Sequence, residues 1–152
     1  MEFNERKLKG VYEIFLNPIR DERGFFMRTY DVDDFQKNKL HNSWIQENHS
    51  LSKKIGIIRG LHLQRPPFTE TKLIRCIHGR IWDVFVDLRY GSETFGQWDA
   101  VELSSENNKM IIIPRGCAHG FLTLSDDCEI LYKVDNYYSR ENECGILWND
   151  PD

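Results

Sequence analysis

Apolar and polar positions alternate over short stretches along most of this chain, and turn-forming residues separate the stretches. Such alternation is typical of β-strands with one buried face. About ten strands are predicted, at residues 10–16, 25–30, 44–52, 57–64, 72–77, 81–88, 98–103, 110–113, 121–124 and 129–135. No regular alternation of helices and strands is present. The pattern therefore predicts a single all-β domain over residues 1–152, either a barrel or a jelly roll.

One short helix interrupts this pattern at residues 31–40, where Asp31 can cap the N-terminus, acidic residues come early and lysines come late. The strand at 81–88 is expected to turn Trp82 and Val84 towards the core. Its Asp83 and Phe85 would then lie on the opposite face, in solvent or in a site.

The strand at 57–64 carries the first candidate for chemistry. Period-two alternation places Gly60 and His62 on one face and Arg59 on the other. A glycine inside a strand marks either a bulge or a close approach by a ligand or another backbone. His62 is thus either a base in a cleft or a hydrogen-bonded core histidine. A later turn, at residues 114–120, is expected to bring His119 to the start of the next strand.

Length and charge narrow the possible classes. A chain of 152 residues can bury one core, and its formal charge of −4 argues against a nucleic-acid partner. There is no membrane-length apolar run and no signal-like start, so we expect a soluble cytoplasmic protein with no membrane partner. The four scattered cysteines are expected to be reduced, and most of them buried.

Three chemistries compete for the histidines. The segment from Pro114 to His119 is similar to half of a cupin metal motif, but its first half is missing, so no metal is expected. Cys117 and His119 are only neighbours in sequence and do not define a nucleophilic dyad. Proton transfer without a cofactor needs a base, an acid and a cation, which His62, Tyr132 and Lys72 can supply. Tyr132 can equally be an ordinary core tyrosine.

Several motifs occur together and in order from about residue 10 onwards, and they resemble those of the dTDP-4-dehydrorhamnose 3,5-epimerase family. They are Asp21-x-Arg23-Gly24-x-Phe26, Gln46-x-Asn48-His49-Ser50-x-Ser52, Arg59-Gly60-Leu61-His62-x-Gln64, Lys72-Leu73-x-Arg75, Asp83-Val84-x-Val86-Asp87-Leu88-Arg89, Thr94-Phe95-Gly96-x-Trp98, Pro114-x-Gly116-x-Ala118-His119-Gly120-Phe121, and Leu131-Tyr132-Lys133 through Tyr137-Tyr138.

The resemblance implies a cupin-type jelly roll (double-stranded β-helix) and a homodimer with exchanged N-terminal strands. It also implies a metal-free epimerase that inverts carbon 3, carbon 5 or both of a nucleotide-diphosphate 4-keto-6-deoxy sugar through an enolate, for surface polysaccharide. It assigns His62 as base, Tyr132 as acid, Lys72 as the cation near the keto oxygen and Asp83 as an orienting neighbour. Substrate contacts are assigned to Arg23, Phe26, Arg28, Gln46, Asn48, Arg59, His119 and Tyr138.

Two departures from the family pattern leave alternatives open. Arg28 stands where rhamnose-pathway enzymes usually carry a glutamate near the nucleobase, so a guanine or cytosine nucleotide, or a heptose, becomes plausible. The family's C-terminal segment, with an aspartate that partners the catalytic histidine, also has no counterpart. The chain is then incomplete, or another carboxylate such as Asp83 holds the His62 tautomer, or activity is reduced. A non-catalytic nucleotide-sugar binding module and a sugar 3,4-ketoisomerase remain the alternative functions.

Overall fold

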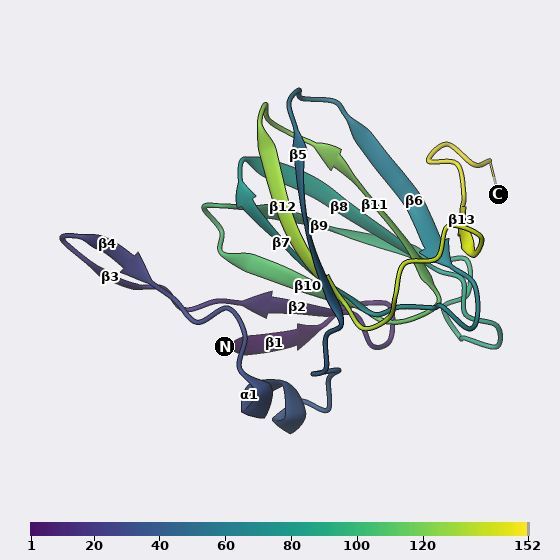
Figure 1. The fold of residues 1–152 in the computed structure, drawn as a ribbon, viewed down its shortest axis with the longest axis horizontal. Helices are drawn as coiled ribbons and strands as arrows, with labels where there is room; N and C mark the ends of the chain where they lie inside the picture. The colour runs from purple at the N-terminus through teal and green to yellow at the C-terminus, as the bar shows by residue number, and fades with distance from the viewer. Residues whose placement is uncertain (152) are drawn as a thin grey trace.

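A computed structural model describes residues 1–151, which fold into two facing antiparallel sheets, a projecting hairpin and one helix (Figure 1). The elements in chain order are β1 (Glu2–Glu5), β2 (Tyr12–Phe15), β3 (Ile19–Asp21), β4 (Gly24–Phe26), α1 (Val32–Lys37), β5 (Gln46–Ser52), β6 (Ile58–Gln64), β7 (Lys72–His78), β8 (Arg80–Asp87), β9 (Trp98–Ser104), β10 (Lys109–Ile113), β11 (Cys117–Thr123), β12 (Cys128–Val134) and β13 (Glu143–Gly145).

The first sheet has the order β1-β2-β10-β7-β12-β5 and the second has the order β13-β6-β11-β8-β9. Neighbouring strands within each sheet are mostly distant in sequence, as in a jelly roll. The apolar core between the sheets includes Ile74 and Ile130 from the first sheet and Phe85 and Phe121 from the second. The predicted all-β jelly roll is confirmed.

Strand β10 is apolar on both faces, and the structure shows why. Ile111 and Ile113 point into the core between the sheets, whereas Met110 and Ile112 belong to a second apolar cluster. Phe35 of α1 completes this second cluster and is fully buried. Helix α1 therefore covers the outer face of the first sheet.

The helix begins where the sequence predicts, because Asp31 adopts extended backbone geometry and its carboxylate accepts a hydrogen bond from the amide of Asp33. The helix ends at Lys37, earlier than the predicted residue 40. The predicted strand at 25–30 is also shorter, since β4 ends at Phe26. β1, β3 and β13 are short strands that the alternation pattern did not delimit.

The prediction for β8 has the wrong face in the core. Asp83 and Phe85 are fully buried, whereas Trp82 is 40% exposed. The pairing register of β8 turns the face with Asp83 and Phe85 towards the other sheet. Trp82 alternates with these residues and therefore points outwards, although it is the larger apolar residue. The consequence is a carboxylate in the interior of the jelly roll.

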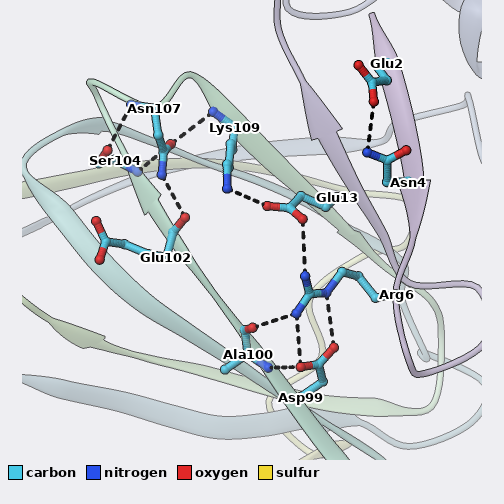
Figure 2. Close-up of polar contacts among 10 residues, drawn as sticks. All are labelled: Glu2, Asn4, Arg6, Glu13, Asp99, Ala100, Glu102, Ser104, Asn107 and Lys109. Atoms are coloured by element: carbon cyan, nitrogen blue, oxygen red, sulfur yellow. Dashed lines mark hydrogen bonds and ion pairs between the residues drawn. The ribbon is translucent and has the colours of Figure 1, made fainter.

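An ion-pair network ties the N-terminal strands to the body (Figure 2). Arg6, just after β1, donates to Asp99 of β9 at 3.1 Å and to Glu13 of β2 at 3.2 Å, and Lys109 of β10 contacts Glu13 at 2.8 Å. The hydrogen bonds that Arg6 donates to the Asp99 carboxylate raise the pKa of Arg6. This network anchors β2, the strand that leads into the β3–β4 hairpin.

The β3–β4 hairpin projects away from both sheets (Figure 1). Its two-residue turn places Asp21 opposite Gly24, and the Asp21 carboxylate accepts from the backbone amide of Arg23 at 2.9 Å. An aspartate whose carboxylate accepts from the amide two residues on is typical of such a turn. Ile19, Phe25 and Phe26 are 71%, 54% and 64% exposed, which is unusual for adjacent apolar side chains.

Candidate active site

His62 and Arg59 of β6 face the same interior space, although their spacing predicts opposite faces. His119 of β11 pairs with His62, and Phe121 pairs with Arg59. The two pairs are three residues apart on β6 but only two residues apart on β11. The extra residue is a β-bulge, which shifts the alternation by one position. The prediction that Arg59 lies on the opposite face is therefore wrong.

Gly60 lies inside this bulge, at φ +106°, and the close approach there comes from backbone. A Cβ at this position would lie 2.6 Å from the carbonyl oxygen of His119 and 2.7 Å from Cα of Gly120. Only glycine fits such a contact. Gly60 thus allows β6 and β11 to approach closely enough to present His62 beside His119, with ring centroids 6.4 Å apart.

Lys72 and Tyr132 come from the other sheet. β7 and β12 pair Lys72 with Val134 and Ile74 with Tyr132, so the lysine and the tyrosine share the inward face. His62, His119 and Asp83 lie on β6, β11 and β8 of the facing sheet. The site is therefore a space between two walls, with the histidine on one and the lysine and phenol on the other.

Two cavities of about 350 and 230 Å³ meet at His62, Lys72 and Tyr132, which line both. The larger is also lined by Gln46, Asn48, Gln64, Glu70, Val134, Tyr138 and Glu143. The smaller is also lined by Ser50, Arg59, Ile74, His119, Phe121 and Ile130. The larger cavity is thus an acidic compartment, with Glu70 and Glu143, and the smaller one a basic compartment, with Arg59 and His119. The three residues proposed for proton transfer lie where the two compartments meet.

His62 is neutral in this site. Burial, followed by the charges of Lys72 and His119, lowers its pKa from 6.5 to about 3. A neutral imidazole can accept a proton, as a base must. Tyr132 has its pKa raised, mainly by burial, so its phenol keeps the proton that an acid must donate.

Asp83 contacts His119, and not the tautomer-setting position of His62 that the sequence suggested for it. Its Oδ2 lies 2.9 Å from Nε2 of His119, which fixes that nitrogen as the donor. Its Oδ1 is buried without a hydrogen-bond partner among residues 1–151. Asp83 therefore orients His119, and its negative charge also raises the pKa of Lys72.

The remaining residues assigned by resemblance divide into two groups. Gln46, Asn48 and Tyr138 line the larger cavity, and the side-chain oxygen of Gln46 accepts from the Tyr138 amide at 2.9 Å. Arg23, Phe26 and Arg28 lie on or beside the projecting hairpin and line neither cavity of this chain. Arg28 instead pairs with Asp31 at 3.0 Å.

Sequence reasoning assigned no role to Gln64, Glu70 and Glu143, which all line the larger cavity. Gln64 shares a strand face with His62 and was therefore detectable. Glu70 lies in a loop and Glu143 begins the three-residue strand β13, and alternation indicates no direction in either segment.

The cysteines and the metal question add little to the site. All four cysteines are free, and Cys76, Cys117 and Cys128 are buried, as predicted. Within residues 1–151, no three histidine, cysteine or carboxylate side chains are grouped closely enough to hold a metal ion. No helix in the same range is long and apolar enough to span a membrane.

The fold and the site define a cupin-type jelly roll with a cavity between its sheets that His62, Lys72 and Tyr132 line. The sequence model described as dTDP-4-dehydrorhamnose 3,5-epimerase matches residues 5–152. The chain belongs to this family and is an isomerase.

Individual relatives agree along nearly the whole chain. A dTDP-4-dehydrorhamnose 3,5-epimerase of Methanothermobacter thermautotrophicus is 46% identical over 150 residues, which are 99% of this chain and 80% of the relative. The Bacillus anthracis epimerase, solved with TDP and pyrophosphate bound, has a TM-score of 0.95 at 40% identity and aligns with 98% of this chain and 85% of its own. The Legionella pneumophila enzyme, in complex with dTDP-4-keto-L-rhamnose, has a TM-score of 0.93 at 36% identity, with coverages of 99% and 79%.

Proposed function

We propose that this protein inverts carbon 3, carbon 5 or both of a dTDP-linked 4-keto-6-deoxy sugar, in deoxysugar biosynthesis, without a cofactor. The observation that carries the proposal is the placement of His62 and Tyr132 on opposite walls of one cavity. Epimerisation needs a base on one face of the sugar ring and an acid on the other. The names of the relatives and the bound molecules in the neighbouring structures supply the substrate class.

In the proposed reaction, neutral His62 takes the proton from the carbon next to the ketone. The electron pair of that C–H bond moves to the keto oxygen and forms an enolate, whose charge the Lys72 ammonium balances. Tyr132 then donates its phenolic proton to the same carbon from the opposite face, and the enolate collapses to the inverted ketone.

The two compartments suit the two ends of such a substrate. Arg59 and His119 line the smaller cavity and can face the anionic diphosphate. Arg59 is held there by its bonds to Ser52 Oγ, at 3.0 Å, and to the Leu51 carbonyl, at 3.2 Å. A diphosphate near His62 would also raise the low pKa of this imidazole and make it a stronger base.

The choice of a thymine nucleotide rests on the relatives and on the state of Arg28. Its ion pair with Asp31 offsets the positive charge that distinguishes this position from the family pattern. An unpaired arginine would favour a different hydrogen-bonding edge of the nucleobase than the family's glutamate does. An arginine paired with an aspartate has no net charge together with its partner, so the sign of the charge beside the nucleobase is not reversed.

The test is proton NMR in deuterated water with dTDP-, GDP- and CDP-linked 4-keto-6-deoxy sugars, following the signals at carbons 3 and 5. Loss of both signals with the dTDP sugar identifies a 3,5-epimerase, and loss of one identifies a single-carbon epimerase. Binding without exchange would overturn the proposal in favour of a binding module. A product with its carbonyl at carbon 3 would instead indicate a ketoisomerase.

We also propose that the active unit is a homodimer in which the β3–β4 hairpin of each subunit completes the site of the other. Phe25 and Phe26 are exposed. The hairpin also projects away from both sheets of its own chain (Figure 1), and both features support this arrangement. The buried, unpaired thiols are compatible with a reducing cytoplasm, the location we propose.

Subunit complementation tests the exchange directly. A co-expressed mixture of His62→Asn and Arg23→Ala subunits contains dimers in which one site combines an intact His62 with an intact Arg23 from the other subunit. At substrate concentrations well below KM, activity should therefore exceed that of either variant alone. No gain in a mixture shown by sedimentation to contain mixed dimers would refute the exchange.

A further inference from the structure

The Lys72 ammonium lies beside a buried carboxylate that the proton-transfer scheme does not use. Lys72 Nζ is 3.4 Å from Oε1 of Glu70, and the two side chains are only 4% and 11% exposed. Both line the larger cavity. Glu70 is thus the ion-pair partner of the cation that faces the reacting centre.

Glu70 is itself held by a network that leaves its carboxylate little freedom. Its Oε2 accepts from Nε2 of Gln64 at 3.0 Å. Gln64 is 3% exposed, and its Oε1 accepts from the backbone amide of Ser139 at 2.6 Å. Its Nε2 also lies within hydrogen-bond distance of the carbonyl oxygens of Phe68 and Tyr137. The orientation of the Gln64 amide is therefore determined by several neighbours.

The backbone next to Glu70 is also anchored. The amide of Thr71 donates to the buried carboxylate of Asp135 at 2.7 Å, and Asp135 pairs with Arg115 at 3.1 Å. Both the side chain of Glu70 and the backbone next to it are therefore held in place before any substrate binds.

The charges around Lys72 oppose one another. Burial lowers the pKa of Lys72 most strongly, and Glu70 raises it, followed by Asp83 and Glu143. Burial also raises the pKa of Glu70, whereas Lys72 lowers it. The other titratable or charged side chains that line the cavities with Lys72 are His62, Arg59, His119, Tyr132 and Tyr138. Without Glu70, the nearest compensation for a desolvated ammonium is lost.

We propose that Glu70 is a positioning residue that keeps the Lys72 side chain charged and aimed at the place where the enolate oxygen develops. This inference rests on the proposed epimerase function for its catalytic consequence. Its electrostatic part concerns this chain alone and can be measured without substrate.

The first experiment is an NMR titration of the lysine Cε–Hε signals in protein labelled with ¹³C-lysine, with the Lys72 signal assigned by its loss in Lys72→Met. In Glu70→Gln, which preserves the shape of the side chain, the Lys72 midpoint should fall by about one pH unit or more. Glu129→Gln is the matched control, since Glu129 is partly exposed on β12 and pairs with His49. An unchanged midpoint in folded Glu70→Gln would overturn the proposal.

Glu70→Ala provides a second variant should Glu70→Gln fail to fold. It also removes the charge, so the Lys72 midpoint should again fall. A midpoint equal to that of the wild type in folded Glu70→Ala would contradict the proposal.

The second experiment measures kcat and KM against pH with the dTDP-linked 4-keto sugar. Loss of the Lys72 proton should form the alkaline limb, so Glu70→Gln should shift this limb to lower pH and reduce kcat with KM nearly unchanged. A raised KM with an unmoved limb would mean that Glu70 contacts substrate directly, and would refute the positioning role. If neither the wild type nor any variant converts the dTDP-linked sugar, the proposed function is refuted. The NMR titration of Lys72 still decides the electrostatic role of Glu70.

Discussion

Two regions of this molecule carry the side chains that the family resemblance assigns to the substrate: the cavity between the sheets and the β3–β4 hairpin. In the cavity, Lys72 and Asp83 are buried and each is matched to an oppositely charged or hydrogen-bonding neighbour. On the hairpin, the Arg23 side chain is 84% exposed and, among residues 1–151, pairs only with Asp21 of the same turn.

The difference shows how the chemistry can be divided. Buried groups of low mobility can hold shifted pKa values, because desolvation acts on them and water does not screen them. Exposed charges are screened by water and salt, so they bind an anion more strongly when a partner surface covers them. The cavity is therefore suited to the proton transfers, and the hairpin is suited to binding.

The largest expected effect comes from the cavity. His62→Asn should reduce deuterium exchange at the reacting carbons by about 10³-fold, because no base remains on that wall. The same substitution at the exposed His49 of β5 is the control and should leave the rate unchanged. Exchange of His62→Asn at the wild-type rate would show that another group is the base.

The next effect separates the two walls of the cavity. Tyr132→Phe should slow inversion by about 10²-fold while deuterium exchange at the starting configuration continues, because the base remains and the acid is lost. Mass spectrometry of recovered substrate and NMR of product distinguish the two events. Equal losses of exchange and inversion would mean that Tyr132 does not act only as the acid.

A smaller effect is expected on the hairpin. Arg23→Ala should raise KM about tenfold with kcat changed by no more than about twofold, since an exposed side chain contributes to binding and not to the chemical step. Glu22→Ala in the same turn is the control. A loss confined to kcat would place Arg23 in the chemistry and would remove the distinction between the two regions.

The smallest effect concerns stability against acid. The pKa of His62 is about 3 in the folded chain and 6.5 in the unfolded one, so the unfolded chain binds more protons between these values. Wild-type stability should therefore fall as pH falls from about 6.5 to about 5.5, by about 1 kcal/mol from this residue. Urea titrations at several pH values should show a smaller loss of stability in His62→Asn than in the wild type. His49→Asn should lose as much stability as the wild type.

The sequence by itself determined the class of fold and most of the strands. Alternation with period two is a local property, since it follows from which residues can lie against a core. It located the apolar strand β10 and the strands that carry His62, Lys72 and Tyr132. The cap of α1 and the turn at Asp21 were likewise predictable, because each depends on a few consecutive residues.

The tertiary structure decided which faces and which partners these strands have. The bulge at Gly60 turns Arg59 inwards, and the register of β8 buries Asp83 in place of Trp82. Neither outcome follows from the residues of one strand, because a shift of one position in pairing reverses every side chain. The contacts of Asp83 with His119 and of Glu70 with Lys72 likewise depend on loops and sheets that alternation does not orient. The pKa of His62 in turn depends on burial, which only the assembled walls provide.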